Sequence, residues 1–329
     1  MFETDIIFSI NSENQFEKVA LEIFRFQAEH TVIYRKYLEL LKCDPGKITS
    51  STQIPFLPVE FFKSHEILVK NQESRAKMKT FSSSGTTDNI VSKHFVSDIS
   101  VYDKSFRKGF ELFYGDVSDY CILALLPSYL EREGSSLVYM MDALIKDSNN
   151  SQSGFYLHNK AELFNVLSEL KKQNQKPLLL GVTYALLDFA ENHPIHFPEL
   201  IVMETGGMKG KREEMIRSDV HEKLKKGFGI SSVHSEYGMT ELLSQAYSSG
   251  DGIFLTPPWM KIIIHQQSDL FSEAGEGQTG VISVIDLANI YSCSFITTQD
   301  VGRKHSDGSF EVLGRTDFSD MRGCNLMVE

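Results

Sequence analysis

The chain has 329 residues, of which 41% are hydrophobic and 11% aromatic, so it can bury an extensive core and is not an intrinsically disordered protein. Its formal net charge of −11 argues against broad binding to nucleic acids or anionic membranes, because both need a basic surface. The N-terminus is acidic where a signal peptide is basic, and no long apolar run follows, so we expect a cytoplasmic protein with no membrane span.

The first part of the chain is predicted to be helical. Apolar residues recur at helical spacing between about residues 13 and 41, in two segments separated by a short break. Residues 54–58, which read Ile-Pro-Phe-Leu-Pro, form an extended connection, because proline restricts both its own φ and the residue before it.

A polar stretch follows in which small hydroxyl residues surround a glycine: Ser82, Ser83, Ser84, Gly85, Thr86 and Thr87. We call it the Ser/Thr loop. These residues make a poor helix and no core, but their N–H groups and hydroxyls suit a loop that cradles phosphate, with Lys93 close behind as counter-charge. On these residues alone, a polar turn between two strands is an equal alternative.

Strands and helices alternate in the middle of the chain. Short apolar runs predict buried strands at residues 120–126, 177–182, 200–203 and 231–235. Helices are predicted at residues 137–145 and 161–172, from 183 to about 192, and at 211–226. This alternation predicts an α/β fold, in which a mostly parallel sheet has helices on its faces.

The pattern of predicted secondary structure changes after about residue 252. Short β runs at 259–265, 281–287, 293–298 and 310–313 are separated by turns of Gly, Asp and Ser, which is typical of an antiparallel segment. We therefore expect an α/β core over residues 1–250 and a smaller antiparallel β subdomain over residues 251–329.

Two polar segments follow predicted strands, where ligands bind in open α/β sheets. One is Thr205-Gly206-Gly207, and the other runs from Ser235 to Glu241. In the second, Tyr237 offers a flat ring and Gly238 allows close approach to the backbone. Thr240 and Glu241 place a hydroxyl beside a carboxylate, which suits Mg²⁺ and phosphate. A strand-to-helix turn capped by Thr240 is the alternative.

Four motifs occur in the order found in adenylate-forming enzymes, the superfamily of acyl-CoA synthetases and luciferases. They are Ser83-Ser84-Gly85-Thr86-Thr87, Tyr237-Gly238-Met239-Thr240-Glu241, Asp300-Val301-Gly302 and Gly314-Arg315-Thr316-Asp317. Residues 237–248 and the ending Arg322-Gly323-Cys324-Asn325-Leu326-Met327 look like the acyl-protein synthetase (LuxE-like) family, which is related to phenylacetate-CoA ligase. The resemblance runs from about residue 80 onward.

The resemblance implies the large N-terminal domain of the adenylate-forming fold. The printed sequence ends soon after Gly314-Arg315-Thr316-Asp317, so the mobile C-terminal lid domain is expected to be absent. That lid normally carries a catalytic lysine. Lys209 and Lys211 are candidate substitutes, and the alternative is that they are solvated residues opening a charged helix.

Family roles can be carried over to the matching positions. The resemblance implies that the Ser/Thr loop wraps the β- and γ-phosphates of ATP, while Gly206 and Gly207 line the adenine pocket. Tyr237, followed by Gly238, stacks on the adenine ring. Asp88 replaces a usual glycine and Lys93 comes later than the usual lysine, so the loop is short of positive charge and should depend more on Mg²⁺.

The same resemblance assigns the remaining nucleotide contacts. Thr240 contacts the α-phosphate, and Glu241 helps to hold Mg²⁺. Asp300 binds the ribose hydroxyls with the help of Arg315, in line with the preference of a vicinal diol for a carboxylate acceptor and with the forked donor geometry of arginine.

Cys324 is the expected acyl acceptor. Acyl-protein synthetases transfer the activated acyl group to a cysteine near their own C-terminus, and this step needs an accessible thiolate. Arg322 is close enough in sequence to lower the thiol pKa. The alternative is a small buried cysteine. The other cysteines, Cys43, Cys121 and Cys293, lie in apolar patterns and are predicted to be core residues.

The resemblance thus implies an ATP- and Mg²⁺-dependent ligase that activates a long-chain fatty acid or a similar carboxylic acid. The acyl group would pass from the acyl-adenylate to Cys324, and then to a partner protein such as an acyl reductase or an acyl carrier. The alternatives are an acyl- or aryl-CoA ligase, and a catalytically weak nucleotide- or acyl-binding subunit of a complex.

Overall fold

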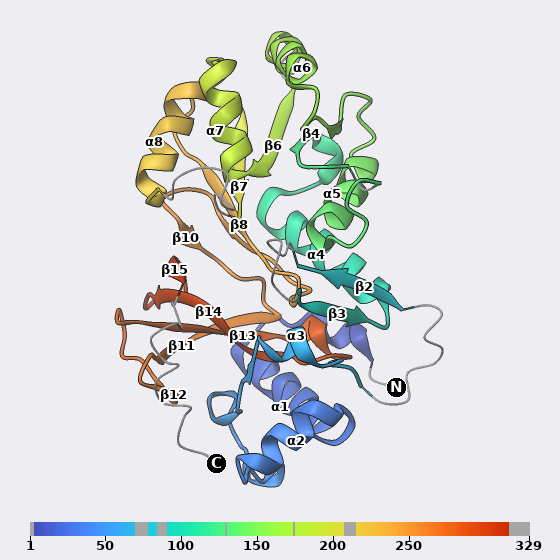
Figure 1. Cartoon of the computed structure of the whole chain (residues 1–329), viewed down its shortest axis with the longest axis vertical. Coiled ribbons are helices and arrows are strands. Elements are labelled where there is room, and N and C mark those ends of the chain that lie inside the picture. Colours follow the sequence, from blue (N-terminus) through green and yellow to red (C-terminus); the bar gives the residue numbers. More distant parts are fainter. Residues whose placement is uncertain are drawn as a thin grey trace.

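The structure of this protein is a computed structural model that describes residues 3–69, 78–83, 91–128, 130–173, 175–206 and 215–315. These residues form a six-stranded sheet, a seven-stranded sheet and a two-stranded hairpin. Figure 1 shows the six-stranded sheet in the upper part of the molecule and the seven-stranded sheet in the lower part. The hairpin lies between them. The buried apolar side chains of both sheets belong to one continuous core.

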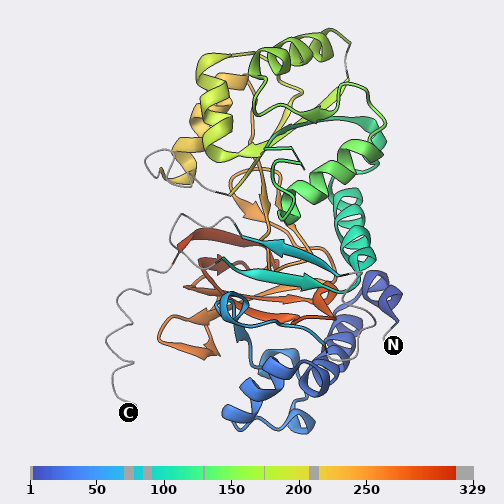
Figure 2. The same ribbon diagram turned by 45° about the vertical axis from the view of Figure 1, so that its right-hand side comes forward.

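Helices α1 (Glu13–His30) and α2 (Val32–Leu40) confirm the two helices predicted near the N-terminus. The Ser12 hydroxyl begins α1 by accepting a hydrogen bond from the Gln15 N–H. Both helices lie beneath the seven-stranded sheet in Figure 2. Phe24 and Tyr34 pack there against Phe295, with ring centroids 5.9 and 6.2 Å away.

The six-stranded sheet confirms the predicted alternation. Its order is β5 (Gly154–Phe155), β4 (Tyr120–Leu125), β6 (Lys176–Val182), β7 (Ile201–Thr205), β8 (His234–Tyr237) and β9 (Ala246–Ser248). All neighbours are parallel except β9, which runs antiparallel to β8. The connecting helices are α5 (Ser136–Asp147), α6 (Lys160–Gln173), α7 (Thr183–Asn192) and α8 (Arg217–Phe228).

Some strand boundaries differ from the prediction: β14 continues to Lys304, well beyond the predicted residue 298, and one strand of the six-stranded sheet begins later than predicted. The strand expected at 231–235 begins at His234 and continues through Tyr237, so Tyr237 lies in the sheet and not in the loop that follows it. The reason is tertiary, because β8 pairs with residues 203–205 of β7 on one side and with β9 on the other.

The two faces of this sheet are covered by different helices. On one face, Tyr114 at the end of α4 (Ile99–Tyr114) has its hydroxyl 3.1 Å from His234 Nδ1. Successive strand residues point to opposite faces, so Glu236 shares the α4 face with His234 while Ser235 faces α7 and α8. Helices α7 and α8 pack closely, because a Cβ at Gly227 would lie 2.6 Å from Ala190 Cβ.

The seven-stranded sheet is antiparallel in its main path, as predicted. Its order is β10 (Ile253–Phe254), β15 (Phe310–Arg315), β14 (Phe295–Lys304), β13 (Thr279–Asp286), β11 (Met260–Gln266) and β12 (Asp269–Glu273). Strand β1 (Leu57–Pro58) adds to β14 in parallel. The sequence had not indicated β10 or β12.

The remaining elements are short. The hairpin pairs β2 (Lys79–Ser82) with β3 (Lys93–Val96), and α3 (Phe61–Ser64) precedes it. The 3₁₀ turns among the described residues are η1 (Thr4–Ser9), η2 (Pro45–Lys47), η3 (Ser51–Gln53), η5 (Val117–Asp119) and η6 (Leu287–Asn289). Within the described ranges, no helix is long and apolar enough to cross a membrane.

Candidate active site

The Ser/Thr loop connects the two strands of the hairpin. At its start the Ser82 N–H donates to the Gly134 carbonyl at 2.7 Å, and the Ser83 hydroxyl accepts from the Ser92 N–H at 3.0 Å. The loop therefore does join two strands. Its central residues Ser84, Gly85, Thr86 and Thr87, and Asp88 after them, lie outside the described residues, so their contacts with phosphate remain a prediction.

Tyr237, Asp300 and Arg315 come together from the two sheets. The Tyr237 hydroxyl donates to Asp300 Oδ2 at 2.9 Å, and Arg315 Nε donates to Asp300 Oδ1 at 3.1 Å. Asp300 and Arg315 are directly opposite each other in the β14–β15 pairing. The structure thus places three of the predicted nucleotide-binding residues in one hydrogen-bonded group.

The Tyr237 ring is itself buried in an aromatic cluster. It contacts Phe254 and Phe310 edge-on, with centroids 6.0 and 5.6 Å away. Burial, and the nearby Asp300 charge, raise the pKa of the Tyr237 phenol well above its ordinary value. The phenol therefore stays protonated and acts as a hydrogen-bond donor to Asp300.

Gly206 follows directly after β7, which pairs with β8, the strand that carries Tyr237. Its φ of +70° lies in the left-handed region, which glycine adopts without strain. Its carbonyl accepts from the Thr183 hydroxyl at 3.1 Å. Gly207, and the candidate lysines Lys209 and Lys211, lie outside the described residues.

The turn from Met239 to Ser244 carries Thr240 and Glu241 and is held from several sides. His94 Nδ1 lies 2.9 Å from the Thr240 carbonyl, and Asn289 Nδ2 donates to the Glu241 carbonyl at 2.7 Å. The buried Asp286 carboxylate accepts from two backbone N–H groups of the turn at 2.7 and 2.9 Å. No helix follows Thr240 before β9, so the alternative that it caps a helix is wrong.

The Glu241 carboxyl is buried, and neighbouring groups stabilise its charged form only weakly. Burial raises its pKa, while a hydrogen bond from Ser92 and the charges of Arg315 and Lys63 act in the opposite direction. Among the described residues no group of three His, Cys, Asp or Glu side chains could hold a metal. Mg²⁺ bound with a nucleotide needs only one or two protein carboxylates, so this donor set fits a shared Mg²⁺ site.

Two buried glutamates, Glu204 and Glu236, lie in the polar segments of the sequence, but no sequence pattern indicated a role for them. Glu204 on β7 faces α7 and α8. Its carboxylate accepts from the hydroxyls of Thr183 and Ser235 at 2.9 and 2.8 Å. Arg217 Nε and His221 Nε2 lie 3.7 and 3.8 Å from Oε1. Burial alone would raise the pKa of Glu204, but His221, Arg217 and the hydroxyls together lower it.

Glu236 on β8 has far less support. The Thr205 hydroxyl donates to its Oε2, and its side chain is otherwise enclosed, with 7% of the residue exposed. Burial, aided by the charge of Glu204, raises the pKa of Glu236 to about 7. Its Oε1 lies 2.4 Å from where a Cβ of residue 238 would be, so a side chain at position 238 would displace the Glu236 carboxyl.

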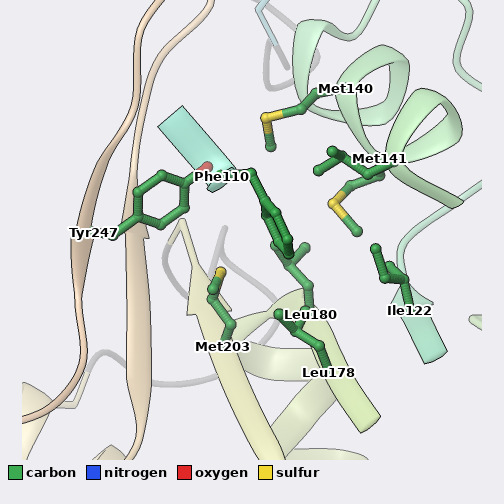
Figure 3. Close-up of a pocket in the computed structure, with 9 residues that line it drawn as sticks. Phe110, Ile122, Met140, Met141, Leu178, Leu180, Met203 and Tyr247 are labelled. Atoms are coloured by element: carbon green, nitrogen blue, oxygen red, sulfur yellow. The ribbon is translucent and has the colours of Figure 1, made fainter. Parts of the chain in front are cut away.

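An apolar cavity lies on the same sheet face as Glu236 (Figure 3). Tyr247 pairs with Glu236 across β8 and β9, and Met203 is two residues before Thr205 on β7. Figure 3 shows Met140 and Met141 pointing from α5 toward these side chains. The cavity of about 10 Å³ has room for roughly one water molecule. Its other walls are Phe110, Ile122, Leu144, Leu178 and Leu180.

The cysteines separate into two groups. Cys121 and Cys293 are buried, as predicted, and burial raises the pKa of their thiols to about 11 and about 12. Cys43 was also predicted to be a core residue, but it follows the end of α2 at Leu40 and is half-buried against the core; burial still raises its thiol pKa. Cys324 lies outside the described residues.

Comparisons with known proteins agree with this arrangement. A family model described as "Acyl-protein synthetase, LuxE" matches residues 6–329. Among solved structures, this chain is similar to an open conformation of 2-hydroxyisobutyryl-CoA ligase in complex with 2-HIB-AMP and CoA, with a TM-score of 0.68 at 11% identity. The alignment includes 93% of this chain and 70% of the ligase chain. No curated protein sequence matches the chain.

ATP-bound MatB from Rhodopseudomonas palustris covers 72% of this chain at a TM-score of 0.54 and 14% identity. The chain spans 47% of that protein, about half of its length. Identities this low establish the fold alone. They confirm the predicted fold class, which is that of the N-terminal domain of adenylate-forming ligases.

Proposed function

Because this chain belongs to the acyl-protein synthetase (LuxE) family, we propose that it activates a long-chain fatty acid with ATP and then accepts the acyl group on Cys324. The observation that carries the proposal is the meeting of Tyr237, Asp300 and Arg315 at the junction of the two sheets. The charge of Arg315 also acts on Glu241, which links this group to the Thr240–Glu241 turn.

Adenylation joins the acid to the nucleotide. A carboxylate oxygen of the acid attacks the α-phosphorus of ATP, the bond to the β-phosphate oxygen breaks, and pyrophosphate leaves. Asp300 accepts hydrogen bonds from the ribose hydroxyls, and Arg315 holds the Asp300 carboxylate in place. Thr240 donates to the α-phosphate, and Glu241 is the protein carboxylate for Mg²⁺, which supplies positive charge at the phosphates.

Acyl transfer then requires a thiolate. The Cys324 sulfur attacks the acyl carbonyl carbon, AMP leaves, and a thioester forms. The raised thiol pKa values of Cys43, Cys121 and Cys293 make these three poor nucleophiles at neutral pH, which supports Cys324 as the acceptor. A reducing cytoplasm suits this chemistry, because free thiols persist there. The acyl group would continue to an acyl reductase or an acyl carrier protein.

The apolar cavity supports a fatty acid as substrate. It lies between the sheet and helices α4 and α5, and its wall residues Met203 and Tyr247 lie on the two strands that flank β8, which carries Glu236. Three of its wall residues are Met140, Met141 and Met203, whose unbranched side chains can rearrange at low cost. We propose that they move aside to admit an unbranched acyl chain.

ATP–pyrophosphate exchange with saturated acids of increasing length tests adenylation. Intact-mass measurement after incubation with ATP and acid tests self-acylation. We expect exchange and a single added acyl group. Cys324→Ala should retain the exchange and lose the added mass, while the matched Cys43→Ala variant should keep both. Asp300→Ala should lose ATP binding and therefore the exchange.

Other outcomes distinguish the alternatives. Thioester formation on free coenzyme A by an undiminished Cys324→Ala variant would make the protein a CoA ligase. Absence of exchange with every acid, together with retained ATP binding, would make it a binding subunit.

A further inference from the structure

A second cavity lies directly behind the Thr240–Glu241 turn and is lined by polar atoms that lack partners. Among the described residues, seven buried side-chain nitrogen or oxygen atoms have no hydrogen-bond partner. Four of the seven belong to residues around this one cavity: His94 Nε2, Ser97 Oγ, Asn289 Oδ1 and Ser292 Oγ. Since buried polar groups are rarely left unpaired, such clustering indicates a bound ligand.

The hydrogen-bonding roles of two of these atoms follow from their neighbours. His94 Nδ1 faces the Thr240 carbonyl, which can only accept, so Nδ1 carries the proton and Nε2 presents a lone pair. Asn289 donates through Nδ2 to the Glu241 carbonyl, which leaves Oδ1 as the acceptor toward the cavity. Both residues are completely buried. The hydroxyls of Ser97 and Ser292 are free to donate.

The ligand that matches two acceptors and two donors is water. The cavity of about 10 Å³ has room for roughly one water molecule. Asp98 is the one acid among the lining residues, and its Oδ1 already accepts from the Ser100 N–H and hydroxyl. The remaining groups are neutral and one is a nitrogen lone pair, so the site does not suit a cation.

We propose that one structural water molecule binds here, donating to His94 Nε2 and Asn289 Oδ1 and accepting from the hydroxyls of Ser97 and Ser292. The water joins the two side chains that hold the Thr240 and Glu241 carbonyls. It thereby connects β3, which leaves the Ser/Thr loop, to η6 beneath the turn. His94 and Asn289 become positioning residues for Glu241, a role that rests on the proposed function.

A high-resolution crystal structure tests the site without reference to activity. We expect one solvent peak at hydrogen-bonding distance from all four atoms. An empty cavity, bonds between the four side chains themselves, or a peak at the shorter distances of a coordinated cation would each overturn the proposal. Ser292→Val places a methyl group in the cavity and should remove the peak, while Ser292→Ala should retain it.

The state of His94 gives a spectroscopic test of the same site. Nitrogen NMR should show a neutral His94 ring with its proton on Nδ1, because burial lowers its pKa to about 4. A ring protonated on Nε2 would contradict the proposal, since that nitrogen could not accept from water.

The positioning role is tested by kinetics. The double variant Ser97→Ala/Ser292→Ala should raise the KM for MgATP by about tenfold, as is typical when support behind a metal ligand is lost. The KM for the acid should not change. Ser168→Ala on α6, whose hydroxyl bonds to the Phe164 carbonyl, is the matched control. Partial unfolding would lower kcat and leave both KM values unchanged, and that result would refute the positioning role.

Failure of the proposed function and failure of this inference are distinguishable. If the native protein shows no exchange with any acid, the proposed function falls, while the solvent peak and the His94 tautomer still decide whether the water is bound.

Discussion

Glu204 and Glu236 lie on neighbouring strands of one sheet, both buried, and they respond to burial in opposite ways. On the α7–α8 face, Glu204 has two hydroxyl donors and two basic side chains around it, and its pKa is lowered. On the α4–α5 face, Glu236 has the Thr205 hydroxyl, and its pKa rises to about 7. Burial is common to both, so the partners decide the charge.

The two glutamates therefore have different structural roles. Glu204 is a compensated anion that ties α8 to the sheet through Arg217, whose guanidinium also donates to the Val312 carbonyl of β15 at 2.9 Å. Glu236 is a nearly uncompensated carboxyl beside the apolar cavity. In its neutral form the Glu236 side chain can lie beside the apolar cavity without the free-energy cost of a buried charge.

The largest expected effect concerns Glu236→Gln and the pH dependence of stability. The folded-state pKa of about 7 exceeds the ordinary value of 4.5. The stabilising contribution of Glu236 is therefore complete below pH 4.5 and is lost as pH rises through 7. This loss amounts to about 3 kcal/mol of unfolding free energy.

Urea unfolding of both proteins at pH 5 and pH 8 measures it. The unfolding free energy of Glu236→Gln, measured relative to that of the native protein, should be about 3 kcal/mol higher at pH 8 than at pH 5. The exposed Glu111→Gln on α4 serves as the control. An equal difference at both pH values would show that Glu236 ionises as an ordinary glutamate.

Glu204→Ala tests the carboxylate whose charge is stabilised by basic neighbours. Loss of this carboxylate leaves Arg217 and His221 facing each other without an anion, and we expect a loss of about 2 kcal/mol of unfolding free energy at pH 7. One third of the Arg217 side chain is exposed, which moderates the cost.

The pH dependence of this effect has the opposite sign. The pKa of Glu204 is lowered, so its contribution is present above the ordinary value of 4.5 and is lost as pH falls through the folded-state pKa. Unfolding of Glu204→Ala across pH 3 to 7 should converge on the native curve at the acid end. A constant gap would mean that packing, and not charge, explains the loss.

Met140→Phe sharpens the functional side of the comparison, because it fills the cavity on the Glu236 face with a stiffer side chain. We expect kcat/KM of ATP–pyrophosphate exchange to fall about tenfold for long acids and to stay unchanged for short ones. The short acids are the internal control for folding. A uniform decrease at every chain length would remove the cavity from the acyl path.

Arg315→Gln should have the smallest effect. Its partner Asp300 is 9% exposed in its side chain, but the Arg315 side chain is 74% exposed, so solvent screens this ion pair. We expect the KM for ATP to rise about threefold, equivalent to less than 1 kcal/mol. A change above a hundredfold would mean that Arg315 contacts the nucleotide directly and does more than orient Asp300.

Much of the architecture was accessible from local patterns. Continuous apolar runs identified β4 and β6, and helical spacing identified α1 and α2. The motif residues Tyr237, Asp300 and Arg315 form one hydrogen-bonded group in the structure, and their shared role in nucleotide binding stays a prediction. The short edge strands β10 and β12 were missed, because two to five residues with weak alternation carry little signal.

The partners of these motifs were not accessible in the same way. His94, Asp286 and Asn289 hold the Thr240–Glu241 turn, yet each is far from it in sequence and sits in no recognisable motif. A buried polar side chain looks the same in a sequence as an exposed one. Its role appears only when folding places it against a particular carbonyl or N–H group.

The sequence by itself therefore determined the order of elements and the identity of the motif residues, since apolar periodicity and residue chemistry are local properties. The tertiary structure decided which face of the sheet each side chain occupies and which groups surround it. That is why Glu204 and Glu236, both glutamates in short strands, differ in charge: the pKa of a buried carboxyl depends on surrounding groups that only the fold brings together.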